Sequence, residues 1–598
     1  MLEKLRSLKR SDERRAPSRG VMGYIADVSL LVVGALALSA WLNLCYPIPI
    51  SEVSHLRVAL EVPVAFALLT LAARFGVPLR WWFFAAASLL ALLARLFMTA
   101  DNVSHRFVFR DFRVPLDLRL VPEFFRLMYD TSPARAVVSY AVMFVIALVC
   151  SVAMVYFVLR GVYRRSSRPS FRWMVVGYIA LTAGLVATQE LRKGSPELYT
   201  RQVSARIAQE AEAATRLPRE RRDILKQIAG VNERIGRSNG PFLDKLGGND
   251  VLFIFVESYG RTVFANKTYS QALVPLFEAM GQRLGDAGFS VASDFVTSPT
   301  YGGYSWFAHV TLDTGVKVIS HLHSQLLDEQ RPTGFAEYFR DAGYQPVIVM
   351  PGTTRTWPGM DDYYGFRDHY FSWEFGYKGP RYGWPTMADQ FVLYHIQKNV
   401  IEPATKPLFI QYALVSSHAP FSDQPRYVDD WETLGNGSIL HKSGRNRFNV
   451  TWGLSGEVSK AYTAAVTYEM QVMEGYLSNY IHDDTLVIFV GDHQPHQLVT
   501  GPENLTWSVP IHVACRNPDL IAPFLRRGYI PGMVPSQPLP HVGMERFMEE
   551  FLADFSTHPL AVDPGIWPPI AERLKQAAEA PVSGGAPANQ PVNQQTAP

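Results

Sequence analysis

Long apolar stretches are concentrated in the first 190 residues of this 598-residue chain. A helix needs about 20 apolar residues to cross a bilayer, and five stretches approach or exceed that length. They cover residues 24–45, 58–73, 81–98, 136–159 and 173–188, the second and fifth being the shortest. The pattern predicts a bundle of about five transmembrane helices within residues 24–190, followed by at least one soluble unit.

Basic residues in the short flanks predict the orientation of these helices. They lie in the N-terminal tail of residues 1–23, at Arg74 and Arg80, and in the loop of residues 160–172. These three regions are therefore expected in the cytoplasm. An odd number of spans then places the chain after residue 190 on the other side, so we expect a multi-pass protein of the inner (cytoplasmic) membrane with an extracytoplasmic, periplasmic domain.

Three further segments differ from both halves. The loop of residues 101–134 is rich in arginine although this topology places it outside. We expect it to lie near lipid phosphates and to pack against the soluble domain, with an ordinary solvated loop as the alternative. Residues 191–247 are charged and helical in pattern and predict an interfacial connector, and residues 574–598 predict a disordered tail. The net charge of +3 gives no reason to expect a nucleic-acid partner.

Strand-like and helical patterns alternate in residues 248–573. The strand-like runs cover residues 251–256, 289–295, 346–350, 408–414, 486–490 and 511–514. Alternation of this kind predicts an α/β domain with a largely parallel sheet. In such sheets ligands bind beyond the carboxyl ends of the strands.

Polar residues that suit metal-assisted chemistry follow three of these runs. Glu257 follows the first run, His418 follows the fourth, and Asp492-His493 follows the fifth. A fourth component is Ser305, directly after Tyr301-Gly302-Gly303-Tyr304. Glu257, Ser305, Asp492 and His493 form an oxygen-rich ligand set with one nitrogen, which suits a manganese, magnesium or zinc ion. A metal can activate a serine hydroxyl as a nucleophile.

Other residues have candidate roles in binding the substrate. His418 can bind a phosphate or protonate a leaving oxygen, and His309, one turn after Ser305, can touch the same anion. Arg355 and Trp357 offer a cation and an aromatic ring near the same rim. Each residue alone also has an ordinary explanation: a helix cap for Ser305, an N-terminal helix acid for Glu257, a cap or salt bridge for Asp492-His493, a structural histidine for His418, and a surface loop for Arg355 and Trp357.

Taken together, these motifs resemble the alkaline phosphatase/sulfatase superfamily. Ser305 and Thr314-Gly315 keep the spacing of the sulfatase nucleophile motif, with His309 where that family has arginine. The closer resemblance is to the membrane-anchored branch of lipoteichoic acid synthases and phosphoglycerol or phosphoethanolamine transferases. Val256-Glu257-Ser258 matches the first metal ligand of that branch, residues 417–421 match its substrate histidine, and Gly491-Asp492-His493 matches its last two ligands.

The resemblance implies a sulfatase-like α/β/α extracytoplasmic domain that binds one divalent metal, manganese first, with zinc or magnesium as alternatives. It also implies a two-step transfer. Ser305, where the branch usually has threonine, would take a phospho-head group from a membrane phospholipid and pass it to an envelope glycan or lipid. A membrane-anchored sulfatase or phosphodiesterase is the first alternative, and a non-catalytic envelope-assembly protein is the second. The single Glu257 in place of paired aspartates favours transfer, whereas Arg355 and Trp357 stand out of the branch's usual order.

Overall fold

The structure is a computed structural model. It describes residues 21–44, 57–118, 121–122, 125, 134–191, 198–236, 241–356, 365–382, 384–448, 450, 455–501, 506–535 and 541–565. The chain divides into two compact units. The first comprises Met1–Val103 and Pro133–Thr215, and the second comprises Ser104–Ser132 and Arg216–Pro598.

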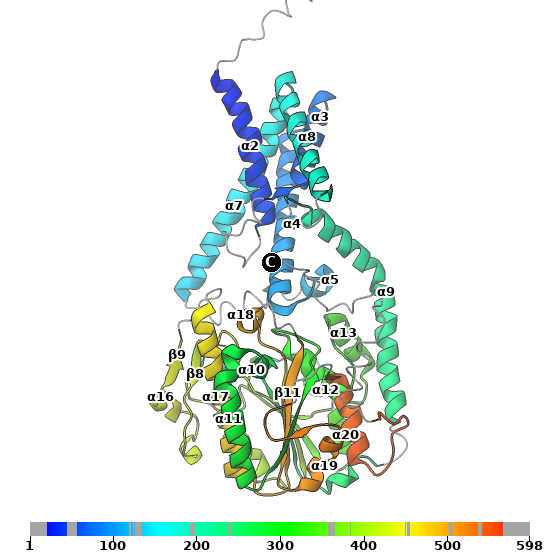
Figure 1. Ribbon diagram of the computed structural model, residues 1–598, viewed down its shortest axis with the longest axis vertical. Coiled ribbons are helices and arrows are strands. Elements are labelled where there is room, and N and C mark those ends of the chain that lie inside the picture. Colours follow the sequence, from blue (N-terminus) through cyan, green and yellow to red (C-terminus); the bar gives the residue numbers. More distant parts are fainter. Residues whose placement is uncertain are drawn as a thin grey trace, which may run out of the picture. The chain divides into compact units, whose positions relative to one another are not determined.

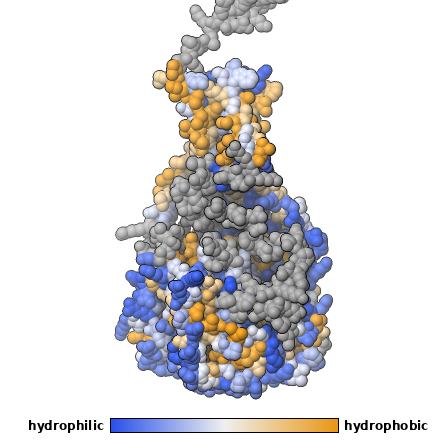
Figure 2. All heavy atoms as spheres, in the orientation of Figure 1, coloured by the Kyte–Doolittle hydropathy of each residue, from blue (hydrophilic) through white to orange (hydrophobic). Residues whose placement is uncertain are grey.

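Each of the five apolar stretches forms a helix. They are α2 (Val21–Asn43), α3 (Glu61–Arg74), α4 (Trp81–Val108), α7 (Ala134–Arg165) and α8 (Pro169–Leu191), all labelled in Figure 1. Within the described residues, four helices are long and apolar enough to cross a membrane, and α3 is shorter, with 14 residues. Apolar side chains, in orange, gather on the surface of this unit (Figure 2). Exposed apolar side chains of α7 include Val138, Val142, Phe144, Ile146 and Val149.

Although α3 is short, it passes from one end of the helix bundle to the other. Just before it, β1 (Val58–Ala59) pairs in parallel with β2 (Tyr199–Thr200), which follows α8. Near its other end, Thr70 Oγ1 lies 3.0 Å from the hydroxyl of Ser166, in the turn that precedes α8. Ser166 precedes α8 and Thr200 follows it, so these two residues lie at opposite ends of α8. Because the segment of α3 contacts both, α3 connects the same two ends of the bundle as α8.

Charged and polar contacts mark these two ends. Near the start of α2, Asp27 forms an ion pair with Arg165 (2.9 Å) and lies 3.4 Å from Arg168. At the last residue of α2, Asn43 Oδ1 accepts a hydrogen bond of 2.5 Å from Thr200. The start of α2 and the residues that follow α8 therefore lie at opposite ends of the bundle. The basic residues Arg165 and Arg168 lie at the end where α2 starts.

A nine-stranded sheet forms the second unit, in the order β12-β4-β11-β10-β3-β7-β5-β6, with β13 paired to β4. The strands are β3 (Val251–Val256), β4 (Ser290–Thr297), β5 (Gln345–Met350), β6 (Asp368–Phe371), β7 (Leu408–Ala413), β10 (Leu486–Gly491), β11 (Ser508–Cys515), β12 (Ile530–Pro531) and β13 (Val542–Gly543). All six predicted strands are present. The strands from β10 to β6 run parallel, whereas β11 is antiparallel to both β10 and β4.

Helices cover both faces of this sheet (Figure 1). The side chains of β3 alternate between two apolar cores. Leu252, Ile254 and Val256 belong to the core that includes residues of α11 (Lys267–Asp286) and α17 (Ser455–Tyr480). The intervening residues pack with α12 (Ser305–Thr314) and α20 (Phe547–Phe555). Burial on both faces explains why the run of residues 251–256 is apolar without interruption.

The contacts of α3 make a testable prediction about topology. If each of the five helices crosses the bilayer once, the N-terminus and the second unit lie on opposite sides, with the basic end of the bundle in the cytoplasm. Reporter fusions after Ser11 and after Gln576 in the full-length protein should therefore report the cytoplasm and the exterior, respectively. Both fusions reporting the same compartment would show that α3 does not cross.

Candidate active site

Two strand ends bring the acidic residues of the site together. β3 and β10 are parallel neighbours in which Gly491 lies opposite Val256, so Glu257 and Asp492 follow at the same edge of the sheet. The chain is tightly packed at this point, since a Cβ atom on residue 491 would lie 1.8 Å from the carbonyl oxygen of Tyr259. Glycine at position 491 therefore allows the two strand ends to approach.

Ser305 is the first residue of α12, and its hydroxyl points into this cluster. Its Oγ donates a hydrogen bond of 2.8 Å to Oε2 of Glu257 and lies 3.2 Å from Nε2 of His493. The residue that precedes the helix is Tyr304, in the left-handed conformation with φ 58°. Ser305 is thus not the N-cap of α12, and its hydroxyl contacts the carboxylate and the imidazole.

The structure brings Glu257, Ser305, Asp492 and His493 into one cluster. His493 Nε2 lies 3.3 Å from Oε1 of Glu257 and 3.8 Å from Oδ2 of Asp492. Glu257, Asp492 and His493 are buried and each offers a ligand atom within 4.8 Å of the others, so they form a candidate metal site. For comparison, tetrahedral ligands at about 2.0–2.1 Å from zinc are about 3.3 Å apart.

The charges of the cluster also suit a divalent cation. Burial, reinforced by the charge of Glu257, raises the pKa of Asp492 well above its usual value. Burial disfavours the charged form of His493, but Asp492 and Glu257 outweigh that effect and raise the pKa of His493 to about 9. The metal-free cluster therefore holds protons that a cation would replace. His493 Nδ1 lies 2.8 Å from the carbonyl oxygen of Gln494, an arrangement that leaves Nε2 as the ligand atom.

His418 is held beside Glu257 by the turn that follows β7. Ser417 Oγ donates a 2.6 Å hydrogen bond to the carbonyl of Glu257, and His418 Nδ1 lies 2.6 Å from the carbonyl of Ala419. Burial lowers the pKa of His418. A neutral imidazole with its proton on Nδ1 presents Nε2 as a proton acceptor.

The chain around this site matches a known family. Residues 249–513 match the sulfatase family. This part of the chain is a sulfatase-family domain. No curated protein matches the chain.

Several solved structures are similar to this chain at low identity. The membrane protein lipooligosaccharide phosphoethanolamine transferase A (EptA) from Neisseria meningitidis is 11% identical with a TM-score of 0.45, covering 90% of this chain and 99% of its own. The zinc complex of the periplasmic domain of EptC from Escherichia coli is 14% identical with a TM-score of 0.36, covering 55% and 89%. The Streptococcus pyogenes phosphoglycerol transferase GacH, in complex with sn-glycerol-1-phosphate, is 12% identical with a TM-score of 0.33, covering 56% and 91%.

The other residues predicted to bind the substrate are His309, Arg355 and Trp357, and the surroundings of His309 and Arg355 differ from those of His418. His309 is buried with its ring 4.3 Å from that of Phe255, and burial lowers its pKa to about 4. It is therefore a neutral imidazole in the core, poorly suited to attract an anion by charge. Arg355 is exposed in the loop after β5, and Trp357 lies outside the described residues.

An aromatic residue that the sequence did not single out lies over His418. The ring of Trp384 stacks on the imidazole at 3.9 Å with an angle of 15°. Gly352, in the loop after β5, makes room for this indole, because a Cβ there would lie 2.9 Å from Cη2 of Trp384. The available signal was the sequence Gly383-Trp384-Pro385, in which an aromatic residue stands within a turn.

A second unpredicted feature is a buried pair of acids behind the His418 turn. Asp389 Oδ2, at the start of α15 (Asp389–Ile396), accepts hydrogen bonds from the backbone of Val415 (2.8 Å) and Ser416 (2.6 Å). Burial and the charge of Asp389 raise the pKa of Glu469 on α17 well above its usual value. A protonated Glu469 beside an ionised Asp389 maintains the acceptor that holds this turn.

The cluster makes a prediction about metal binding in the full-length protein. Asp492→Asn should bind Mn²⁺ at least about 100-fold more weakly than the wild type, because loss of even an outer-shell partner commonly costs 10–100-fold. Because the metal displaces the proton of His493, wild-type affinity should rise with pH and level off above the pKa of about 9.

Isothermal titration calorimetry in buffers of different ionisation enthalpy measures both the affinity and the protons released. The exposed Asp519 on α19 (Pro518–Arg526) provides a matched control, and Asp519→Asn should bind Mn²⁺ like the wild type. Equal affinity in the Asp492 variant, or affinity independent of pH, would contradict the ligand set.

Proposed function

We propose that this protein is a membrane-anchored, metal-dependent phosphotransferase of the sulfatase family. It would move a phospho-head group, phosphoglycerol or phosphoethanolamine, from a membrane phospholipid to an envelope glycan or lipid. The observation that carries the proposal is the position of the Ser305 hydroxyl, which contacts both Glu257 and His493 in the candidate metal site. Manganese is our first choice of metal, with zinc or magnesium as alternatives.

In the first step, Ser305 Oγ attacks the phosphorus of the lipid phosphodiester. The Oγ–P bond forms, the bond from phosphorus to the diacylglycerol oxygen breaks, and that oxygen takes up a proton from water. Oε2 of Glu257, 2.8 Å from Oγ, is placed to accept the serine proton. A bound divalent cation would supply Lewis acidity that stabilises negative charge on the phosphoryl oxygens.

In the second step, an acceptor hydroxyl attacks the same phosphorus, the bond from phosphorus to Ser305 Oγ breaks, and Oγ takes back the proton held by Glu257. His418 is suited to take the proton from the incoming hydroxyl, since its pKa is lowered and Nε2 is the acceptor nitrogen. Trp384, stacked on the imidazole, keeps the ring in one plane and offers an apolar surface beside it. The same geometry would accept water in place of an alcohol, which is the hydrolase alternative.

The apolar helices favour a lipid donor. Exposing a buried acyl methylene to water costs about 0.8 kcal/mol, so a phospholipid does not readily leave the bilayer. An enzyme anchored in the same membrane meets its donor there. We place the catalytic domain on the extracytoplasmic side, where envelope acceptors lie, on the basis of the basic flanks and the five-helix path.

Mass spectrometry of the purified protein after incubation with head-group-labelled phospholipids tests the proposal. The wild type should carry label on Ser305 and release diacylglycerol, whereas Ser305→Ala should carry none and turn over about 10³-fold or more slowly. Ser438 is an exposed loop residue, and Ser438→Ala should behave like the wild type.

Two results would contradict parts of the proposed mechanism. Labelled Ser305 that discharges only to water would favour the hydrolase alternative. Near-normal turnover by Ser305→Ala would contradict the covalent mechanism.

A further inference from the structure

A segment between two apolar helices belongs to the catalytic unit. Residues 104–132, which comprise the end of α4 and the chain that links it to α7, form one compact unit with the sulfatase-family domain. Among the described residues of this segment, Leu116 on α5 (Val114–Asp117) is part of the apolar core shared with α12 and α20. The expectation that this loop packs against the soluble domain is therefore confirmed for the described residues 104–118.

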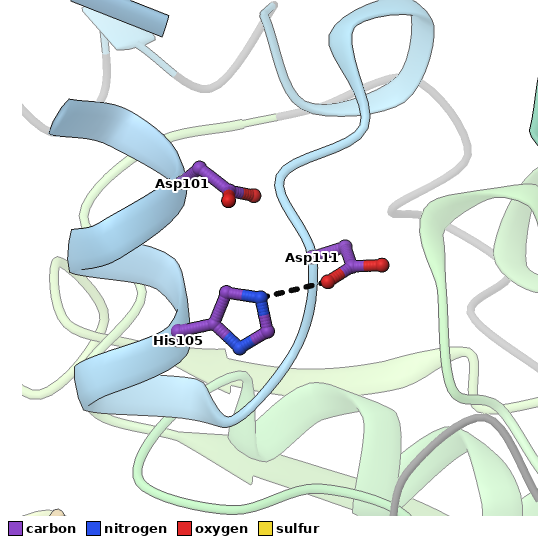
Figure 3. A group of neighbouring side chains, drawn as sticks. All are labelled: Asp101, His105 and Asp111. Atoms are coloured by element: carbon purple, nitrogen blue, oxygen red, sulfur yellow. Dashed lines mark ion pairs between the residues drawn. The ribbon is translucent and has the colours of Figure 1, made fainter. Parts of the chain in front are cut away.

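At the end of α4 the chain turns back on itself. Figure 3 shows His105 on the helix paired with Asp111 on the returning strand of chain, with His105 Nε2 2.7 Å from Asp111 Oδ1. Ser104 Oγ also donates a 2.8 Å hydrogen bond to the carbonyl of Arg110. The side chains of His105 and Asp111 are about half exposed, at 50% and 54%, so their pairing shapes the turn without forming a buried site.

The two residues at the tip of this turn contact the two tyrosines that flank Gly302-Gly303. Phe109, with φ 52°, places its ring 4.6 Å from that of Tyr301 at 75°, an edge-to-face contact. Arg110 places its guanidinium 4.8 Å from the ring centroid of Tyr304 and donates a 3.1 Å hydrogen bond to the hydroxyl of that tyrosine. We name Phe109 and Arg110 the inter-span clamp.

The clamp acts on a strained turn. Tyr304 has a φ of 58°, which is unfavourable for a residue with a Cβ atom and must be maintained by surrounding contacts. The backbone of Tyr301 forms a β-bridge with Gln494, which follows His493. This bridge connects the start of the turn to the candidate metal site. Ser305 follows Tyr304 directly. Its direction toward Glu257 therefore depends on the conformation of Tyr304.

We propose that Phe109 and Arg110 are positioning residues that hold Tyr301 and Tyr304 so that the Ser305 hydroxyl meets Glu257 and His493. The segment linking two membrane helices is thereby part of the nucleophile's support. The proposal rests on Ser305 as the reacting group, and not on the identity of the lipid or the acceptor.

Arg110 is better suited to this role than to binding a lipid phosphate. Its side chain is only 12% exposed and forms a 2.7 Å ion pair with Asp117, whose side chain is 2% exposed. Asp117 also accepts a 2.8 Å hydrogen bond from the backbone of Arg113. With its charge neutralised by a buried carboxylate and its Nη2 donating to both Asp117 and Tyr304, Arg110 holds the protein's own groups.

Hydrogen–deuterium exchange of the full-length protein in detergent tests the proposal without a substrate. Arg110→Ala and Phe109→Ala should each speed exchange in peptides covering residues 301–310 by about tenfold. Peptides covering residues 251–258 and 486–493 should stay within about twofold of the wild type. The control Arg221→Ala, which removes an exposed ion pair with Glu329, should change neither region.

A double-mutant cycle separates positioning through Tyr304 from a general packing role. Glycine adopts positive φ without strain, so Tyr304→Gly should make the turn independent of Arg110. Arg110→Ala should then add less than about twofold to the exchange of residues 301–310 in the Tyr304→Gly background. Unchanged exchange in Arg110→Ala, equal acceleration of all peptides, or an undiminished effect in the glycine background would each overturn the proposal.

The labelled-phospholipid assay adds a second readout. Arg110→Ala should lower kcat about tenfold or more with KM nearly unchanged, because the nucleophile is misplaced while the donor still binds. A rise in KM at constant kcat would overturn the proposal in favour of direct contact with the donor. If the wild type shows no turnover of phospholipid, the proposed function fails, and the exchange measurements still decide the role of the clamp.

Discussion

The parallel pairing of β3 with β10 is the constraint on which the site depends. It places Val256 opposite Gly491, and the next residue of each strand is an acid. Burial and, after it, the charge of the neighbouring Glu257 raise the pKa of Asp492 well above its usual value. Protons or a cation must compensate the negative charge of Glu257 and Asp492. The protonated His493 supplies one positive charge, and the ligand atoms lie close enough together to bind a divalent ion.

Ser305, the proposed nucleophile, reaches this site by a different means. Ser305 comes from the start of a helix, and the turn before it, at Tyr304, is conformationally unfavourable. Contacts from Gln494 on one side and from the inter-span clamp on the other stabilise that turn. Residues held in unfavourable backbone conformations need such support from surrounding contacts. In this protein the support comes partly from a segment that belongs to the membrane-spanning region in sequence.

Much of this arrangement could be predicted because apolar runs report buried strands directly. The six strand predictions placed Glu257, His418 and Asp492-His493 at strand ends, and the structure brings these residues together. The antiparallel position of β11 was not predicted, since its apolar run reads the same in either direction. Trp384, Asp389 and Glu469 were missed because stacking and shared protons depend on tertiary contacts that leave no periodic pattern. In the sequence, Arg110 is one of several arginines in residues 101–134 and no pattern distinguishes it from the others, although its partner Asp117 lies within the same segment.

Anomalous diffraction from crystals of the full-length protein grown with Mn²⁺ tests the central claim most directly. We predict one strong peak within about 2.0–2.3 Å of Glu257, Ser305, Asp492 and His493, with the serine oxygen as a ligand. A peak bound elsewhere, or a cluster that holds no metal at saturating Mn²⁺ while its side chains keep the present geometry, would contradict the account.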